Sequence, residues 1–359
     1  MKIGILTFHS AHNYGAVLQA YCLQKKLEQL GHEVYIIDYR PQYLTKNFYR
    51  ISIKCFISKS IKGLIKKWSN EPFLIKKRFE RYNNFESFIS NQLKLSPFIN
   101  NEFPNFDAIF LGSDQIWNKD ITGGNFDDIY FGGNAKCKII SYAASNKTKE
   151  LSNEDSHYYL EQLKKFTAIS VREELLANLL MESTPYNIET TLDPTLLAGK
   201  IILDNLVFKL KNETPFVFIY ELSSHNYTIN IARMIAKKLR TKIIEIEGDW
   251  SAKRITQKDM GASPEKFISY IAQAEYVVTT SFHGTVLSII YQKPFYAIRQ
   301  NNSSDIRIES ILKLLGLEDR FLLSNQTPSF KPINYNEVNK KLKSLQLASE
   351  DFIINSLRN

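Results

Sequence analysis

The stretch that decides the fold is residues 263–298, which read SPEKFISYIAQAEYVVTTSFHGTVLSIIYQKPFYAI. Ser263 is a good helix N-cap and Pro264 suits the first helical turn, so we expect a helix over 264–273. An apolar strand (276–280), a second helix (285–291) and another strand (294–298) follow. Strands that alternate with helices in this way indicate a parallel sheet with helices on both faces.

The same alternation occurs along the whole chain. Further strands are expected at 2–7, 34–38, 107–111, 138–143, 168–171, 215–222 and 242–247, and helices at 16–30, 228–240 and 305–315. A chain of 359 residues is long enough for two domains. We therefore expect an α/β protein with two Rossmann-like, doubly wound domains that face a cleft. The predicted divisions are a first domain (1–192), a linker (193–214), a second domain (215–330) and a C-terminal helix (331–359) that packs back on the first domain.

The positive charge of the chain is local. The formal net charge is +9, and residues 42–100 contain twelve basic and three acidic residues, so this segment carries the whole excess. We interpret it as a basic helical insertion in the first domain. Its clearest amphipathic helix, around residues 53–68, has apolar residues on one side and lysines on the other. It either packs on the first domain with a solvated lysine face or lies on an anionic membrane surface.

Other features of the sequence favour the cytoplasm. The N-terminus MKIGILTF is typical of a buried strand, not of a secretory signal peptide, and no apolar run is long enough to span a bilayer. The three cysteines are scattered and have no CxxC spacing, which argues against a disulfide framework and a structural zinc site. We expect a cytoplasmic protein, with peripheral attachment to the inner face of the cell membrane as an open alternative.

The junction between strand 276–280 and the next helix is the strongest candidate for chemistry. A strand that passes into a helix points unpaired N–H groups and the positive end of the helix dipole outward, which favours an anion. Gly284 would let a ligand approach the backbone closely, and Thr285 adds a hydroxyl group. His283 lies at the tip of this junction and is suited to proton transfer near neutral pH.

The sequence resembles the polysaccharide pyruvyl transferase family. The resemblance is carried by 263–298, with its SFHGT and KPF motifs, and by ILTFHSAHNYGAVLQAYCLQKKLEQLGHEVYIIDYRP at 5–41. Four shorter motifs follow in the order of the family: LGSDQIWN (111–118), SYAAS (141–145), SVREE (170–174) and LDPTLL (192–197). RIESILKLLGLEDR (307–320) completes the set, and 42–100 is the least family-like part. The resemblance implies a fold similar to that of GT-B glycosyltransferases, and transfer of a pyruvyl group from phosphoenolpyruvate to a sugar diol as a ketal, with release of phosphate.

This reaction needs cationic or N–H-rich pockets for the phosphate and carboxylate of phosphoenolpyruvate, and groups that move protons. We assign the acid/base role to His283 and a clamp on the donor to Arg172, whose alternative is a salt bridge with a neighbouring glutamate. Donor binding is also assigned to the residues around the helix start and the following strand: Ser281, Gly284, Thr285, Lys293 and Arg299. For Lys293 and Arg299 a merely solvated side chain is the alternative, and Arg307 is a further candidate of the same kind.

The loops of the first domain are expected to bind the sugar acceptor. The candidates are polar and aromatic residues that follow predicted strands: His9, His12, Asn13, Tyr14, Ser113, Asp114, Gln115 and Trp117. Carboxylate and amide groups bind sugar hydroxyls, and an aromatic face stacks on a sugar ring. Two alternatives stay open, because Trp117 also fits a core position and Asn13 also fits a helix N-cap.

The histidines and acids form no strong metal-ligand set, so we expect no metal site and no obligatory cofactor, with a divalent ion on the phosphate of the donor as an open alternative. The expected partners are phosphoenolpyruvate and a sugar of an exopolysaccharide or capsule precursor, either polymeric or lipid-linked. We expect no nucleic acid, because the sequence has no recognition motif. The main alternative function is that of a GT-B glycosyltransferase that uses a nucleotide sugar, since a shared fold does not fix function.

Overall fold

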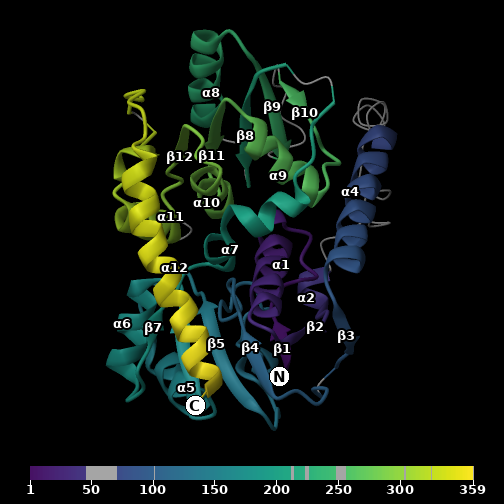
Figure 1. Ribbon diagram of the computed structural model, residues 1–359, viewed down its shortest axis with the longest axis vertical. Coiled ribbons are helices and arrows are strands. Elements are labelled where there is room, and N and C mark those ends of the chain that lie inside the picture. The colour runs from purple at the N-terminus through teal and green to yellow at the C-terminus, as the bar shows by residue number, and fades with distance from the viewer. Residues whose placement is uncertain are drawn as a thin grey trace, which may run out of the picture.

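The computed structural model describes residues 1–45, 71–100, 102–211, 214–222, 226–247, 256–302, 305–324 and 326–358. These residues form two parallel-sheet α/β domains stacked along the long axis of the molecule (Figure 1). The arrangement is GT-B-like, as the sequence predicts. The predicted amphipathic helix around 53–68 lies outside the described residues, so its packing stays a prediction.

The sheet of the first domain has seven strands in the order β3-β2-β1-β4-β5-β6-β7. Every recorded pairing between them is parallel. The strands are β1 (Lys2–Leu6), β2 (Glu33–Asp38), β3 (Leu95–Phe98), β4 (Ala108–Leu111), β5 (Lys138–Ala144), β6 (Ala168–Val171) and β7 (Glu189–Thr190). Because all carboxyl ends meet at one edge, the loops after these strands converge there.

The sheet of the second domain has six parallel strands in the order β10-β9-β8-β11-β12-β13. They are β8 (Phe216–Glu221), β9 (Lys242–Glu247), β10 (Gln257–Lys258), β11 (Tyr276–Thr279), β12 (Phe295–Ile298) and β13 (Phe321–Leu322). The sequence analysis missed the edge strands β3, β7, β10 and β13. They are short, so they lack the apolar runs by which the central strands are found.

Helices cover both sheets. In the first domain they are α1 (Tyr14–Gln29), α2 (Gln42–Thr45), α4 (Glu71–Gln92), the 3-10 turn η2 (Asp128–Phe131), α5 (Asn153–Leu163) and α6 (Glu174–Ser183). The chain continues with α7 (Pro194–Leu203) and the 3-10 turn η3 (Asp204–Leu206). In the second domain they are α8 (Asn226–Leu239), α9 (Pro264–Gln273), α10 (Phe282–Ile290), α11 (Asp305–Leu315) and η4 (Glu318–Arg320), followed by α12 (Tyr335–Arg358).

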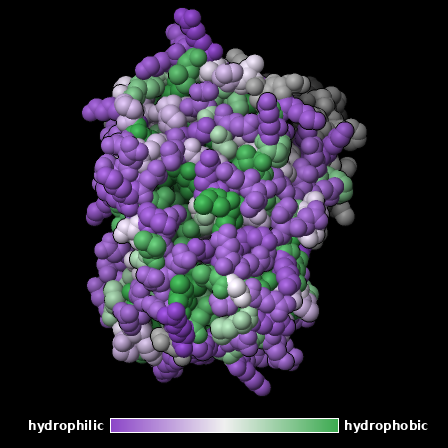
Figure 2. All heavy atoms as spheres, in the orientation of Figure 1, coloured by the Kyte–Doolittle hydropathy of each residue, from purple (hydrophilic) through white to green (hydrophobic). Residues whose placement is uncertain are grey.

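The segment predicted as a linker, 193–214, contains the helix α7, which lies between the domains (Figure 1). Asp193 caps this helix and Pro194 occupies its first turn. α7 packs against α1 of the first domain, α10 of the second, and α12. Figure 2 shows a largely hydrophilic face on which hydrophobic residues gather near the middle, at the level where α7 lies in Figure 1. The connection is therefore a packed helix of the interface and not an extended linker.

The predicted insertion at 42–100 also belongs partly to the domain itself, because β3 is the edge strand of the first sheet. The helix α4 reaches the second domain, where the Asn84 side chain donates a hydrogen bond to the carbonyl of Gly261 (2.6 Å). Tyr14 on α1 makes a second bridge, since its hydroxyl donates to the carbonyl of Ala262 (2.9 Å). These hydrogen bonds between the domains hold the carboxyl edges of the two sheets opposite each other.

The C-terminal helix α12 leaves the second domain and packs back on the first (Figure 1). The Ser349 hydroxyl accepts a hydrogen bond from the backbone N–H of Leu192 (2.9 Å). At the far end of α12, the Lys138 ammonium donates to the carbonyl of Leu357 (3.0 Å). The helix therefore runs beside the segment that enters α7 and holds that segment in place.

Candidate active site

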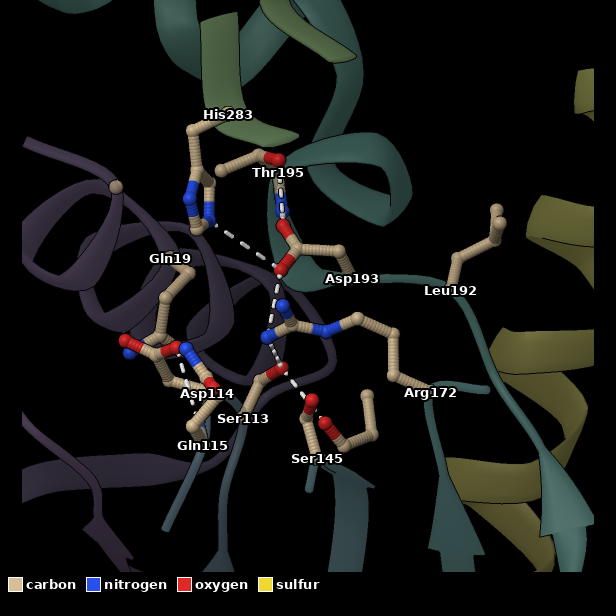
Figure 3. Close-up of polar contacts among 12 residues, drawn as sticks. Gln19, Ser113, Asp114, Gln115, Ser145, Arg172, Leu192, Asp193, Thr195 and His283 are labelled. Carbon is tan, nitrogen blue, oxygen red and sulfur yellow. Dashed lines mark hydrogen bonds and ion pairs between the residues drawn. The ribbon is translucent and has the colours of Figure 1, made fainter. Parts of the chain in front are cut away.

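Charged side chains from both domains meet between the two carboxyl edges (Figure 3). Ser113 follows β4, Arg172 follows β6, and Asp193 and Thr195 lie at the start of α7. His283 comes from the first turn of α10. We call these five residues the interdomain cluster. The strand order places β4, β5 and β6 side by side, so their loops bring these side chains together although up to 170 residues separate them in sequence.

Arg172 is held on two sides. Its guanidinium donates to the Ser113 hydroxyl (2.5 Å) and forms an ion pair with Asp193 (3.0 Å). The central carbon of the guanidinium lies over the ring of Phe282, 5.0 Å from the ring centroid. The Nε and one terminal nitrogen have no hydrogen-bond partner among the described residues. A buried guanidinium with unused N–H groups is suited to bind a carboxylate or phosphate.

Asp193 is the counter-charge at the centre of the cluster. One carboxylate oxygen accepts from the backbone N–H of Thr195 (2.9 Å) and from its hydroxyl (2.5 Å). The other oxygen lies 3.0 Å from Arg172 and 3.5 Å from His283. Burial by itself would raise the pKa of this carboxyl, but Arg172, His283 and the Thr195 hydrogen bond outweigh burial and hold the pKa below its usual range. Asp193 is therefore a fixed negative charge between two basic groups.

His283 is buried among polar groups at the domain interface and not in an apolar core. Its Nε2 faces Asp193 (Figure 3), and its other face lies directly on α1. A Cβ atom added to Gly15 would be 1.9 Å from the Nδ1 of His283, so only glycine leaves room for the imidazole. The predicted position of this histidine between the two domains thus agrees with the structure, although it lies within α10 and not in a loop before it.

A cavity of about 90 Å³ opens beside the cluster. It lies between the loops that follow β6 and β7, the start of α10, and the helices α11 and α12. Arg172, Asp193 and Arg307 line it, together with Phe282 and Glu173. The Nε of Arg307 has no hydrogen-bond partner in the described part of the chain. Burial, and then the positive charge of Arg172, lowers the pKa of Arg307, as expected for two guanidinium groups in one pocket.

Glu173 is a second titratable group in the same cavity. Its carboxyl accepts a hydrogen bond from the Ser145 hydroxyl (2.8 Å), while the other oxygen is buried without a hydrogen-bond partner among the described residues. Burial raises the pKa of Glu173 to about 6, although Arg172 and Arg307 act in the opposite direction. A carboxyl with such a pKa exchanges a proton readily near neutral pH.

The other donor residues predicted at the start of α10 have structural partners. The Ser281 hydroxyl caps the helix by accepting from the N–H of Gly284, and its carbonyl accepts from the N–H (3.0 Å) and hydroxyl (3.0 Å) of Thr285. A Cβ on Gly284 would lie 2.3 Å from the Thr279 hydroxyl, so this glycine permits close packing on β11. The predicted hydrogen bonds from Gly284 and Thr285 to a phosphate therefore do not fit, because Ser281 already accepts from both.

Lys293 and Arg299 lie apart from the cluster. Lys293 precedes β12 and so lies at the amino edge of the sheet, opposite the candidate site. Arg299 follows β12, but its guanidinium pairs with Glu309 (3.1 Å) and lies over the ring of Phe321. The prediction that these two cations enlarge the donor pocket is not supported by these positions.

The four predicted acceptor residues after β1 are mostly buried and paired. His9 pairs with Asp38 (3.0 Å) and His12 with Glu86 (2.8 Å). Asn13 is the N-cap of α1, which was the alternative interpretation of this residue. Tyr14 is fully buried at the contact with the second domain, where its ring stacks on Phe267 (4.5 Å between centroids). All four thus shape the edge of the site without offering a free side chain face to a sugar.

The residues after β4 divide into two groups. Trp117 is fully buried, donates to the carbonyl of Tyr130 (3.1 Å) and stacks on Phe131, so it belongs to the core and cannot stack on a sugar in this structure. Ser113 is buried and orients Arg172. Asp114 and Gln115 remain partly exposed, and Figure 3 shows them beside Gln19 in the same region as the cluster. These two stay candidates for acceptor binding.

The sequence analysis did not assign Asp193, Thr195 or Glu173 to the site and gave Arg307 only a minor place. Asp193 was taken as the start of a linker, yet the sequence Asp-Pro-Thr is typical of a capped helix start. Glu173 was considered only as a salt-bridge partner of Arg172. Its position directly after a strand and beside Arg172 was the available indication.

No group of three or more histidine, cysteine, aspartate or glutamate side chains in the described ranges could hold a metal ion. No helix in the described part of the chain is long and apolar enough to cross a membrane.

The fold and the site define a two-domain α/β protein of the GT-B type, with a buried ionic cluster and a cavity between its domains. A family model described as polysaccharide pyruvyl transferase matches residues 13–302, which is most of the chain. The chain belongs to the polysaccharide pyruvyl transferase family and is an enzyme of that family. No curated protein matches the sequence.

Solved structures of similar shape share little sequence with this chain. The UDP-GlcNAc 2-epimerase from Methanocaldococcus jannaschii is 10% identical, with a TM-score of 0.46, and the match covers 96% of this chain and 92% of that one. The UDP-GlcNAc 2-epimerase from Neisseria meningitidis is 11% identical (TM-score 0.44; 97% and 100% covered). The E. coli ADP-heptose lps heptosyltransferase II is 11% identical (TM-score 0.34; 98% and 100% covered). The fold description rests on the strand order and not on these scores.

Proposed function

We propose that this enzyme moves the pyruvyl group of phosphoenolpyruvate onto a sugar diol of a polysaccharide or a lipid-linked glycan, as a ketal, with release of phosphate. The family supports a pyruvyl transferase of polysaccharides. The observation that carries the proposal is the cavity lined by two buried arginines and by Glu173. Asp193 lines the same cavity, and its carboxylate lies 3.5 Å from the Nε2 of His283 of the second domain.

The arginines suit the charge of the donor. Phosphoenolpyruvate has a carboxylate and a phosphate on adjacent positions, and Arg172 and Arg307 line one cavity with unused N–H groups. Planar guanidinium groups bind both kinds of anion with two parallel hydrogen bonds. Asp193 and Glu173 compensate the charge of the two buried guanidinium groups, so that the pocket is close to neutral by itself.

The proton carriers suit the rest of the reaction. C3 of phosphoenolpyruvate takes up a proton and becomes a methyl group, which makes C2 electrophilic. One sugar hydroxyl adds to C2, the bond from C2 to the phosphate oxygen breaks, and the second hydroxyl closes the ring. The two hydroxyl protons thus end on C3 and on the departing phosphate. In our proposal His283 and Glu173 move these protons, and Asp193 orients the imidazole.

The direct test is phosphate release from phosphoenolpyruvate in the presence of candidate glycans, followed by mass spectrometry for the ketal product. His283→Ala should abolish turnover while the protein remains folded, and Arg172→Lys should weaken donor binding more than acceptor binding. Substantial turnover of the histidine variant, or unchanged donor affinity of the arginine variant, contradicts the assigned roles. Thermal stabilisation by nucleotide sugars, but not by phosphoenolpyruvate, would favour the glycosyltransferase alternative.

We further propose that the reaction needs no metal or other cofactor and takes place in the cytoplasm, with peripheral attachment through the basic segment 42–100. Twelve basic residues in that segment support attachment to anionic lipid. Activity that is lost in a chelator and restored by a divalent ion would contradict the proposal that no metal is needed. Equal co-sedimentation with anionic and neutral liposomes would contradict the proposed attachment to anionic lipid.

A further inference from the structure

A second, more open pocket lies in the first domain, away from the interdomain cluster. Its volume is about 530 Å³. The side chains that line it are mainly aromatic or acidic, and they include Tyr39, Tyr43, Phe126, Asp127 and Asp128. We call it the aromatic–acidic pocket. It has several times the volume of the cavity beside Arg172, so it has room for a sugar unit.

The two tyrosines are fixed by one carboxylate. Tyr39 follows β2 directly and Tyr43 lies in α2, and both hydroxyls donate to the same oxygen of Asp127 (2.8 Å from Tyr39). The other oxygen of Asp127 accepts from the backbone N–H of Ile129 (3.0 Å) and caps the turn η2. The phenol oxygens therefore have their protons directed at Asp127 and keep lone pairs for an incoming hydroxyl donor.

Phe126 and Asp128 share one neighbour, Tyr158 on α5. The rings of Phe126 and Tyr158 stack, with 4.6 Å between centroids and 16° between planes. The Tyr158 hydroxyl donates to Asp128. An aromatic ring and a carboxylate are thus presented together before any ligand binds, which lowers the ordering cost of binding.

The charges in the pocket restrict the ligand. Asp127 and Asp128 line it, and the residues that line it include no lysine or arginine. The ammonium of Lys119 lies 5.2 Å from the centroid of the Phe126 ring, but it is paired with Asp155 (2.5 Å). Phosphate and uronate groups therefore meet net negative charge and are repelled. A neutral sugar ring offers a C–H face for aromatic carbon and hydroxyls for carboxylate and phenol oxygens. We infer that the aromatic–acidic pocket binds a neutral sugar unit of the acceptor glycan. Its role as an acceptor subsite rests on the proposed function.

Tyr130 connects this pocket with the candidate active site. Its ring is fully buried and makes edge contacts with Tyr39 (5.6 Å) and with Phe8 (5.0 Å), which follows β1. Burial, then Asp127, and also Asp114 raise the pKa of Tyr130, so both acids lie within electrostatic reach of its hydroxyl. A glycan held in the pocket can therefore extend past Asp114, and the bound unit is one that neighbours the sugar receiving the pyruvyl group.

The test uses the full chain and a panel of neutral methyl glycosides (glucoside, galactoside, mannoside and N-acetylglucosaminide), with binding measured by ligand-observed NMR. We expect the unmodified protein to bind at least one of them. Tyr43→Ala and Asp128→Ala should each weaken that binding about tenfold, since about 50 Å² of apolar contact or one hydrogen bond has that value. Asp128 is exposed, so its removal leaves the fold intact.

The matched control is Tyr35→Ala, which removes a partly exposed tyrosine of β2 that does not line the pocket. This variant should bind the glycoside normally. If no glycoside binds, or both pocket variants bind it normally, the inference is overturned. Phosphate release from phosphoenolpyruvate is measured on the same samples. Sugar binding without phosphoenolpyruvate turnover refutes the proposed function alone, and normal turnover with an unchanged sugar KM in both variants refutes the subsite alone.

Discussion

Two ionic clusters lie at the carboxyl edge of the first sheet, and they differ in how many of their hydrogen-bonding groups have a partner. The interdomain cluster contains Arg172, Asp193 and His283 and receives side chains from both domains. The second, which we call the β1–β2 cluster, consists of five residues of the first domain: His9, His12, Asp38, Arg40 and Glu86. Both combine histidine, arginine and carboxylate groups, so residue types alone do not distinguish them.

The difference lies in the burial of the arginine and the carboxylates and in unused polar atoms, because the histidines are buried in both clusters. In the interdomain cluster the side chains of Asp193, Arg172 and His283 are 0%, 4% and 7% exposed, and unused guanidinium N–H groups lie beside a cavity. In the β1–β2 cluster Arg40 and Glu86 are 28% and 30% exposed, and Arg40 bonds to both Asp38 (2.7 Å) and Glu86 (3.1 Å). A site is thus indicated by buried groups whose bonding capacity is incomplete, whereas the paired cluster holds a loop in place.

The largest effect is expected from Asp193→Asn. Removal of this charge leaves Arg172 without its buried counter-ion, which should cost about 3–5 kcal/mol of stability at pH 7 and abolish turnover. Because the folded pKa lies below the usual value, the stabilisation by Asp193 is complete above about pH 4 and is lost in stronger acid. Urea unfolding of the variant and wild type should therefore converge at low pH. The control Asp204→Asn, at the exposed end of α7, should change stability little; an equal loss in both variants would contradict the central role of Asp193.

A smaller loss is expected from Gly15→Ala. The added Cβ would overlap His283, so either the imidazole or α1 must move, at a cost of about 1–3 kcal/mol and with loss of turnover. A double-mutant cycle with His283→Ala sharpens this test, because the smaller residue removes the overlap. In that background Gly15→Ala should be nearly neutral in thermal unfolding. A full penalty in both backgrounds would show that the clash with His283 is not the cause.

Glu173→Gln should change how the free energy of unfolding depends on pH. The rise in the pKa of Glu173 from 4.5 to about 6 corresponds to about 2 kcal/mol of stability. The folded state holds this proton more tightly than the unfolded chain, so wild-type stability falls as the pH rises from 4.5 to 6, and the variant should lack that fall. The pH profile of phosphate release should also lose its inflection near pH 6. Glu174→Gln, an exposed neighbour, is the control, and an unchanged inflection in Glu173→Gln would exclude this carboxyl as a proton carrier.

The sequence could predict the features that depend on local patterns, but not those that depend on tertiary contacts. The central strands and most helices follow from apolar runs and caps, and α9 and α11 occur at their predicted bounds. Arg172 and His283 were found because each lies where a strand ends. The role of Asp193 depends on a tertiary contact with His283, 90 residues away in sequence, and periodicity says nothing about that contact. The burial of Trp117 depends on Phe131 and Tyr159 in the same way.

The second source of error in the predicted site was that the direction of a strand was not taken into account. Lys293 and Arg299 flank the same strand, β12, and in sequence they look equivalent. In a parallel sheet the two ends of a strand lie at opposite edges, so Lys293 cannot reach the carboxyl edge where the site lies. Gly284 illustrates a related limit, since a glycine in a strand–helix junction can admit a ligand or a neighbouring side chain, and here Thr279 occupies that space.

The smallest effect is expected from Glu86→Gln, and it tests whether the β1–β2 cluster is only structural. The His12 hydrogen bond, and then Arg40, lower the pKa of Glu86 although burial acts against them. The carboxylate therefore stabilises the fold above about pH 4.5, and this contribution is lost as the pH falls through the folded pKa. Because Glu86 is partly exposed, the loss at pH 7 should be no more than about 1 kcal/mol, with donor binding unchanged. Glu80→Gln on the same helix α4, where Glu80 pairs with Lys77, is the control. A loss of stability as large as that of Asp193→Asn would remove the distinction between the clusters. It would show that a carboxylate in the partly exposed, paired network stabilises the fold as much as the buried carboxylate of the candidate active site.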